Sequence, residues 1–549
     1  MSNIDRTRRN FIKASVLGAT TLALPSIFPG KSNILAKTGQ ELTFRPYPHQ
    51  WMPEMTWAFT TNEHADPFKS PINVTQDGIV VPRDVGDRKF AVNTRWFVEG
   101  FGFVELRADN GGEFYTAEGF SQRRQLNLNY ELARSRVLQN RRVMSRYRKT
   151  GTEFSNEVKT LIALSDDYFQ QAEKLLGQGE ACAKNADKSL EYAMWASEKI
   201  ELEHARQQIL KQAREQFYFG CETRQYIWAK SEVFTERFED LFNFATVTHY
   251  IWDTWYPVFE PREGEHRWGI KDEIVDWLME NDITIQGRPM FWFHPDVTPD
   301  WLAEKSYPEL QDYVKRHVTA MVNHYGDKVK QWSVINEYHD WANIHDHTPE
   351  QITEITRLAC DTVKDVDPEV TRIINNCCPW AGYAAWGGSA DGQTDRQLRS
   401  PRKYLEDITE AEVDFDVIGL QMYFPRRDLA EIVRHVERFE KFGKPIYISE
   451  IGASSGATEE SVQTGDLGIS QEPYEWHRRW DEELQADWLE QLYTVLYARP
   501  SIKALNWYDF ADFRTFIHNG GLIKVNGRRK KSYYRLQNLI DQWGHSDKG

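Results

Sequence analysis

From residue 215 onwards, apolar strand-like runs alternate with amphipathic helical runs. The expected strands are residues 217–221, 244–248, 283–292, 329–336, 372–376, 417–423, 446–450 and 502–507. Between them, apolar residues recur three and four positions apart, as in helices, over 270–279, 309–325, 353–366, 429–442 and 483–497. Eight alternating units favour a closed barrel over an open sheet, so we predict an α/β fold, a (β/α)8 TIM barrel, over residues 215–543.

Two of these strands end on a glutamate. One reads Trp-Ser-Val-Ile-Asn-Glu and ends at Glu337, and the other reads Ile-Tyr-Ile-Ser-Glu and ends at Glu450. The strands are the fourth and seventh, and the C-terminal ends of barrel strands face one mouth. Cleavage of a glycosidic bond needs one acid to protonate the leaving oxygen and a second carboxylate to attack or to activate water. Alternatively, each glutamate only pairs with a loop arginine.

Two regions of different periodicity precede the predicted barrel. Residues 40–125 carry short alternating runs separated by Asp-Gly and Asn-Gly-Gly turns, which predicts a small β-sandwich. It is either a carbohydrate-binding module with exposed Trp51, Trp57 or Trp96, or a structural cap on the barrel. Residues 126–214 show helical periodicity, which predicts a helical hairpin that acts as a spacer and packs on the barrel; a partner-binding coiled coil is the alternative.

The first 36 residues are expected to be an export signal rather than part of the fold. Arg8, Arg9, Phe11 and Lys13 precede a moderately apolar run, a pattern that resembles a twin-arginine signal. We therefore expect a periplasmic or secreted protein. No later stretch is long and apolar enough to predict a membrane span, so no membrane insertion is expected after removal of the signal.

Composition narrows the possible partners. The formal net charge of −15 disfavours nucleic acid, which is bound through clustered Lys and Arg. The 20 Trp and 24 Tyr are compatible with stacking on sugars, although core packing explains them equally well. Five cysteines, with Cys377 and Cys378 adjacent, do not form an even disulfide framework, and small buried side chains are favoured over a thiol nucleophile.

The two glutamate strands, taken with further motifs in order, resemble the glycoside hydrolase family 10 xylanases over residues 215–543. The further matches include Glu260-Pro261, Pro299-Asp300-Trp301, the Ile-Asn-Asn at 374–376, and the Ile-Gly-Leu-Gln that ends at Gln421. The resemblance implies a (β/α)8 barrel and retaining hydrolysis of internal β-1,4 linkages, with Glu337 as acid/base and Glu450 as nucleophile. It also implies a sugar site lined by His294, Asn336, Gln421 and Trp507, together with Trp255 and Trp292.

The chain departs from the family pattern on the glycone side. The family's Glu-Asn and Lys-Trp pairs are replaced around Tyr250 to Tyr256, where Trp255 alone remains. Arg288 stands in the family's Gly-His-Thr motif, and Tyr423 replaces the histidine of Gln-x-His. We assign Arg288 and Tyr423 to the substrate site as well. Because lost hydrogen-bonding groups change discrimination strongly, the reaction is predicted more firmly than xylan as the substrate.

The sequence predicts no cofactor and no metal site. His345-Asp346-His347 has no third ligand at a fixed spacing, so a solvated loop is expected. The expected partner is a plant- or algal-type polysaccharide, most simply xylan, and the expected state is a monomer. The alternatives are a charged or decorated β-glycan, with Arg288 and Arg426-Arg427 pairing with uronate or sulfate, and a non-catalytic carbohydrate-binding protein.

Overall fold

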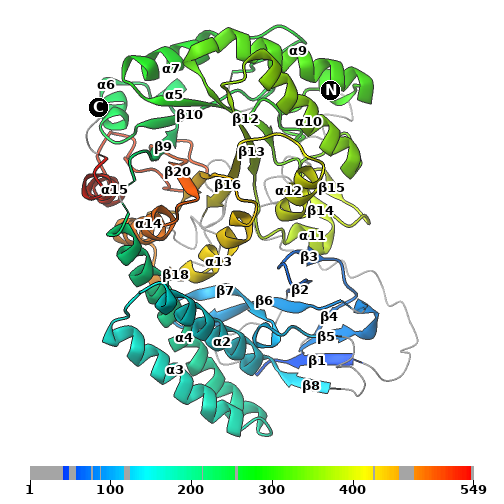
Figure 1. The fold of residues 1–549 in the computed structure, drawn as a ribbon, viewed down its shortest axis with the longest axis vertical. Coiled ribbons are helices and arrows are strands. Elements are labelled where there is room, and N and C mark those ends of the chain that lie inside the picture. Colours follow the sequence, from blue (N-terminus) through cyan, green and yellow to red (C-terminus); the bar gives the residue numbers. More distant parts are fainter. Residues whose placement is uncertain are drawn as a thin grey trace.

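The computed structural model describes residues 41–47, 57–75, 78–86, 88–116, 124–212, 214–253, 257–423, 427–456 and 475–545. The expected signal (1–36), Trp51, Trp255 and Arg426 lie outside these described residues. Along the chain, two β-sheets come first, then long helices, then a barrel that takes up the larger end of the molecule (Figure 1). Within the described residues no helix is long and apolar enough to cross a membrane.

Eight parallel strands close the predicted barrel. In chain order they are β9 (Tyr218–Glu222), β10 (Phe244–Thr248), β11 (Thr284–Arg288), β12 (Gln331–Asn336), β13 (Thr371–Asn376), β16 (Val417–Tyr423), β17 (Ile446–Gly452) and β20 (Ile502–Trp507). Each pairs with the next, and β20 pairs with β9 to close the ring. The predicted (β/α)8 fold is confirmed. The strands are almost entirely buried because helices cover the outside, which explains their continuous apolar runs.

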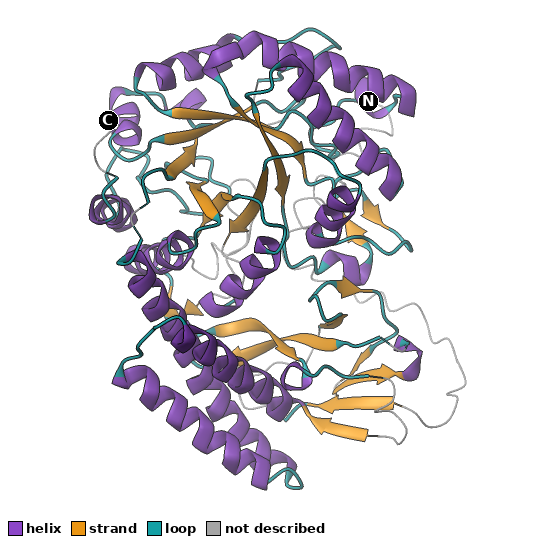
Figure 2. Ribbon diagram, viewed as in Figure 1, coloured by secondary structure: helices purple, strands orange, loops and turns teal. Residues whose placement is uncertain are grey.

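Helices lie outside the barrel strands, as Figure 2 shows. They are α5 (Tyr226–Ala229), α6 (Glu232–Glu239), α7 (Gly269–Glu280), α8 (Asp300–Ala303), α9 (Tyr307–Tyr325), α10 (Pro349–Val366), α11 (Tyr383–Trp386), α12 (Pro401–Glu410), α13 (Leu429–Glu440), α14 (Glu482–Tyr497) and α15 (Lys531–Gln542). Local sequence sets their starts: α9 begins with a capping box of Ser306 and Glu309, and α10 with one of Thr348 and Gln351. Both helices have proline in the first turn, where its missing N–H costs nothing.

The β-rich region forms two four-stranded sheets. One has the order β4 (Asn73–Thr75), β5 (Gly78–Pro82), β1 (Glu41–Arg45), β8 (Arg124–Asn127); the other has β3 (Pro67–Phe68), β2 (Ala58–Thr61), β6 (Ala91–Val98), β7 (Gly102–Ala108). Trp96 is fully buried, so the expectation that it is exposed is wrong. The half-buried Trp57 packs against Trp386 of the barrel, with ring centroids 5.1 Å apart and the rings tilted by 47°. In this structure neither Trp57 nor Trp96 presents a freely exposed ring on the β-sheets on which a sugar could stack.

Three helices connect the sheets to the barrel: α2 (Leu128–Lys149), α3 (Asn156–Lys174) and α4 (Gly179–Ile209). They pack side by side below the barrel in Figure 1. The helix α4 carries the buried Glu198, which accepts hydrogen bonds from the Leu429 backbone N–H at 2.8 Å and from His477 Nε2 at 2.6 Å. The helices thus contact the barrel directly.

Buried ion pairs join the N-terminal region to the barrel. Asp66 accepts hydrogen bonds from Arg438 Nη2 at 2.6 Å and Arg402 Nε at 2.7 Å. Arg136 of α2 makes a bidentate pair with Asp428, both contacts 2.7 Å. Because charges removed from water are costly unless paired, these contacts fix the relative position of the two parts.

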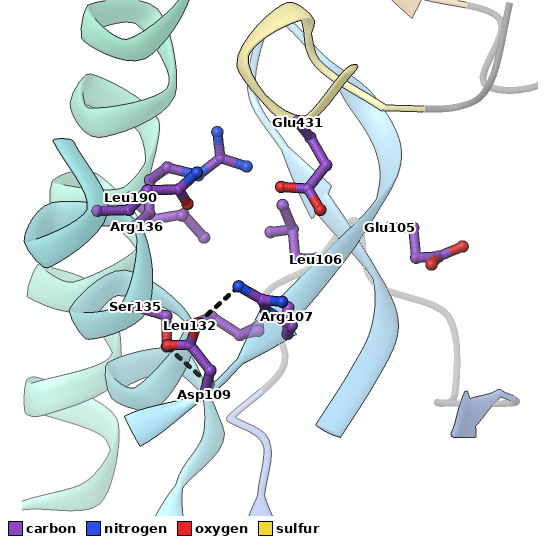
Figure 3. Close-up of a pocket in the computed structure, with 10 residues that line it drawn as sticks. Glu105, Leu106, Arg107, Asp109, Leu132, Ser135, Arg136, Leu190 and Glu431 are labelled. Carbon is purple, nitrogen blue, oxygen red and sulfur yellow. Dashed lines mark hydrogen bonds and ion pairs between the residues drawn. The ribbon is translucent and has the colours of Figure 1, made fainter. Parts of the chain in front are cut away.

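A small polar pocket lies at this junction (Figure 3). It is lined from β7 by Arg107, from α2 by Ser135 and from α13 by Glu431. Arg107 donates to Asp109 at 2.8 Å, and the Asp109 backbone N–H donates to Ser135 Oγ at 2.9 Å. The pocket is therefore lined by a charged network of the chain itself.

Candidate active site

Glu337 lies immediately after β12 and is buried, with 5% of its surface exposed. Its backbone has a φ of 58°, in the left-handed region that a residue with a Cβ seldom adopts. The conformation is held by hydrogen bonds: its N–H donates to the Asn375 carbonyl at 2.9 Å, and its carbonyl accepts from Ala342 N–H at 3.2 Å. Strain of this kind is concentrated at functional sites, where the surrounding structure maintains it.

Neighbouring amides orient Glu337. Gln421 Nε2, on β16, donates to Glu337 Oε1 at 2.6 Å. Asn375 Nδ2 donates to Asn336 Oδ1 at 2.7 Å and fixes which way that amide points. The Asn336 nitrogen is buried and makes no hydrogen bond of ordinary geometry within the described part of the chain. The Asn336 side chain also helps to lower the pKa of the neighbouring Glu337, so a ligand hydroxyl at this point would share the amide donor with Glu337.

Glu450 lies within β17 and is gripped by two side chains. Arg288 Nη2 from β11 donates to its Oε1, and the Tyr423 hydroxyl from β16 donates to its Oε2. Gln421 is the register partner of Glu450 across β16 and β17, so the amide that holds Glu337 stands beside the strand position of Glu450. The structure thus brings the two predicted acids to one mouth of the barrel.

The two acids differ in their electrostatic surroundings. Burial, with the nearby negative charge of Glu450, raises the pKa of Glu337 to about 7. Burial also raises the pKa of Glu450, but the Arg288 charge and the Tyr423 hydroxyl oppose the shift. Environments that separate two carboxyl pKa values are the physical basis for dividing acid and nucleophile roles. Glu337 is suited to hold a proton near neutral pH, and Glu450 is the more stabilised as a carboxylate.

A partly exposed aromatic row stands on another side of the mouth. Tyr250 and Trp292 have ring centroids 5.2 Å apart, and Trp292 and His294 have centroids 4.6 Å apart. Burial lowers the pKa of His294 to about 4, so its ring is neutral at pH 7. Trp292 Nε1 is buried and has no partner among the described residues. Rings with such a free donor can stack on a sugar face and bind a hydroxyl.

Several residues that the sequence assigns to a binding site or to a solvated loop are placed differently from expectation. Trp507 is fully buried and donates its indole N–H to the Gly520 carbonyl at 2.9 Å, so it has no free face for a sugar in this structure. Arg288 is buried and ion-paired with Glu450, so it supports the acid instead of offering its charge to a substrate. The loop with His347 is not fully solvated: His347 is buried, with Nδ1 2.7 Å from the Tyr338 hydroxyl.

Sequence reasoning missed a third carboxylate. Glu222 ends β9, is fully buried, accepts a hydrogen bond from the Thr246 hydroxyl at 2.7 Å and lies 3.8 Å from Arg288 Nη1. Arg288 therefore lies between Glu222 and Glu450. Tyr508 was also missed, and its ring lies under the Arg224 and Arg288 guanidinium groups at 4.4 and 5.6 Å. The strand-end rule that identified Glu337 would have found Glu222 as well.

Paired glutamates at the mouth of a closed eight-stranded barrel, one with a pKa raised by burial and one held by an arginine, define the class of a barrel glycoside hydrolase. Residues 208–538 match the sequence profile of glycosyl hydrolase family 10. The chain belongs to this family and is an endo-xylanase-like glycoside hydrolase.

Curated relatives and solved structures show low identity to the chain. Endo-1,4-beta-xylanase B of Thermotoga neapolitana is 22% identical over 313 residues, which cover 53% of this chain and 78% of the relative. Endo-1,4-beta-xylanase 3 of Arabidopsis thaliana is 21% identical, covering 57% of this chain and 36% of the relative. The crystal structure of native xylanase 10B from Thermotoga maritima aligns with a TM-score of 0.45 at 21% identity, over 62% of this chain and 97% of that one.

Proposed function

We propose that the protein hydrolyses internal β-1,4 linkages of a xylan-type polysaccharide with retention of configuration. The observation that carries the proposal is the placement of two buried glutamates at one barrel mouth, with Glu337 held by Gln421 and Glu450 held by Arg288 and Tyr423. Membership of glycosyl hydrolase family 10 and the endo-1,4-beta-xylanases among the curated relatives support it.

The proposed mechanism is a double displacement. Glu450 attacks the anomeric carbon while Glu337 donates its proton to the leaving oxygen, and a covalent glycosyl-enzyme forms. Glu337, now ionised, removes a proton from water as that water attacks the same carbon and releases Glu450. The side-chain nitrogen of Asn336 donates to a hydroxyl of the bound sugar, and the Trp292–His294 row stacks beside that sugar.

The substrate is tested with a panel of xylan, mixed-linkage glucan, mannan and a uronate-rich glycan. We expect reducing ends to be released from xylan by the wild type and by the control Glu410→Ala, which changes an exposed acid on α12. Glu450→Ala should release none. Unchanged hydrolysis by Glu450→Ala would contradict the proposed nucleophile, and an inverted product in a proton NMR time course would contradict the double displacement.

The charged-glycan alternative loses part of its support. Its proposed anchors are Arg288, Arg426 and Arg427. Arg426 lies outside the described residues, whereas Arg288 pairs with Glu450 and Arg427 pairs with Glu105 of β7. Arg288 and Arg427 are both buried. Preference for the uronate-rich glycan in the panel would restore this alternative.

The export and assembly of the chain are also proposals. Arg8, Arg9, Phe11 and Lys13 support twin-arginine export to the periplasm or medium. We expect replacement of Arg8 and Arg9 by lysine to retain the precursor inside the cell, as fractionation would show. We also propose a monomer, which light scattering of the purified chain tests.

A further inference from the structure

Three metal-binding side chains meet beside the segment between β10 and α7, and none is used in the proposed mechanism. They are Glu260 and His266 of that segment and His317 of α9. Glu260 Oε2 lies 3.0 Å from His317 Nδ1 and 3.5 Å from His266 Nε2. The two imidazole nitrogens lie 3.4 Å from each other. The three atoms therefore form a nearly equilateral triangle.

The size of the triangle fits a tetrahedral metal ion. Zinc binds nitrogen and carboxylate oxygen at about 2.0–2.1 Å, so two ligands at the tetrahedral angle are about 3.3–3.4 Å apart. The three observed separations scatter around this value. One imidazole nitrogen from His266 and one from His317 face the same carboxylate oxygen, which leaves one point that all three ligand atoms can reach.

The surroundings supply the supporting contacts that a metal site needs. Tyr313, one turn before His317 on α9, donates its hydroxyl to Glu260 Oε2 at 2.6 Å. The Gly264 backbone N–H donates to Glu260 Oε1 at 2.7 Å. These contacts hold the carboxylate in place, as outer contacts do around metal ligands. His317 and Glu260 are buried, whereas His266 is partly exposed and gives an ion a route from solvent.

The two facing imidazole nitrogens both lie next to the Glu260 carboxylate, and the Tyr313 hydroxyl lies 3.2 Å from His317 Nδ1. Only one proton can lie between His266 Nε2 and His317 Nδ1, and His317 Nε2 is buried with no hydrogen-bond partner among the described residues. Coordination uses both facing lone pairs at once and fixes the His317 proton on Nε2, which packs near the Phe291 ring. A set of two imidazoles and one carboxylate favours zinc and similar transition metals over the hard ions Ca²⁺ and Mg²⁺.

We propose that Glu260, His266 and His317 bind one zinc ion, with water as the fourth ligand. The ion braces residues 257–268, since Glu260 N–H also donates to the Ile251 carbonyl at 2.9 Å and Arg267 N–H to the Phe259 carbonyl at 2.8 Å. Ile251 directly follows Tyr250 of the aromatic row. The site is structural, because its three protein ligands contact no residue assigned to acid or nucleophile chemistry.

The test is zinc binding to the purified full chain after chelator treatment and dialysis. We expect one zinc per chain by elemental analysis, a rise in Tm with added Zn²⁺, and visible absorption bands of tetrahedral cobalt when Co²⁺ is added instead. His266→Phe removes one ligand while a ring remains between Phe259 and Trp268, and it should weaken zinc binding by at least about 10-fold to 100-fold.

The matched control is His324→Phe on α9, the helix that carries His317. The His324 imidazole stacks on Trp268 and lies outside the triangle. This variant should bind zinc as tightly as the wild type. Tyr313→Phe should weaken binding without removing a ligand. A wild type that binds no stoichiometric zinc, or a His266→Phe variant that binds it as tightly as the wild type, overturns the proposal. None of these readouts depends on hydrolase activity.

Discussion

At the scale of single residues, the environment of each carboxyl explains its assigned role better than its place in a motif. Glu337 has a pKa raised to about 7 by burial and by Glu450, while Glu450 keeps a buried arginine and a tyrosine hydroxyl as donors. A glutamate beside Arg288 and Tyr423 is stabilised as a carboxylate and is poorly suited to donate a proton, whereas one at the position of Glu337 is suited to it.

Removing the proton donor should depend on the leaving group. Glu337→Gln should lower kcat on xylan about 10²-fold to 10⁴-fold, the range for loss of general acid catalysis. In aryl xylosides with acidic phenols, the phenolate leaves without being protonated. The rate of glycosyl-enzyme formation from these substrates should therefore fall much less. Steady-state and burst kinetics on both substrate types check this, and an equal loss on both would argue against Glu337 as the acid.

Glu337 should also make stability depend on pH. Its pKa is about 7 in the folded chain against about 4.5 when unfolded, so between these pH values the folded state holds the extra proton and stability falls as pH rises. Glu337→Gln avoids the buried charge and should be more stable than the wild type by up to about 3 kcal/mol at pH 8. At pH 4 the difference should vanish. Urea unfolding at both pH values measures it.

Arg288 should set the acid limb of the pH–activity profile. Its charge lowers the pKa of Glu450, so Arg288→Met should raise that pKa and move the acid limb of kcat/KM to higher pH. Arg288→Lys keeps a positive charge and should restore most of the limb. A limb that stays in place in Arg288→Met would show that the ion pair has no influence on the nucleophile.

At the scale of elements, the apolar runs predicted the barrel because each strand is buried on both faces and reads as one continuous run. Three strands, such as β10, match their predicted bounds, whereas β11 ends at Arg288 and not at Trp292. The pairing of Arg288 with Glu450 joins residues 162 positions apart, so no local pattern predicts it. The sequence places Arg288 and Trp507 at strand ends of the barrel. It does not predict that both side chains are buried, because their burial depends on neighbours that only the closed barrel provides.

The contact between β11 and β12 predicts a sharp response to one added methyl group. A Cβ at Gly287 would lie 2.2 Å from the Trp332 ring on β12. Gly287→Ala should therefore destabilise the chain by about 1–3 kcal/mol or more through overpacking. Gly269→Ala is the control, because nothing lies within 4 Å of its Cβ at the start of α7. Chemical unfolding of both variants decides whether this contact is as tight as described.

At the scale of the whole molecule, the N-terminal sheets and helices are fastened to the barrel by buried charges. Asp66 pairs with Arg402 and Arg438, and Arg136 pairs with Asp428. Buried pairs of this kind fix geometry more than they add stability, because desolvation offsets much of the attraction. The β-sheets are thus held in a fixed position against the barrel.

Removing one partner should be costly at this junction. Asp66→Ala leaves the buried Arg438 without its carboxylate and the partly buried Arg402 paired with Glu406 alone among the described residues, and should destabilise the chain by about 3–5 kcal/mol. The exposed pair of Lys188 and Glu191 gives the control, since Glu191→Ala should cost no more than about 1 kcal/mol. Differential scanning calorimetry measures both, and equal small losses would mean that the junction tolerates unpaired charge.

The Asp66–Arg438 pair also bears on how the chain is made. Its two residues are separated by 372 positions, so at about 5–20 residues per second Arg438 leaves the ribosome roughly 20–70 s after Asp66. During that interval the N-terminal sheets exist without the cations that neutralise their buried acid. The N-terminal sheets can therefore form their ion pairs with the barrel only late in translation. In nascent chains truncated before Arg438, Asp66 lacks this partner.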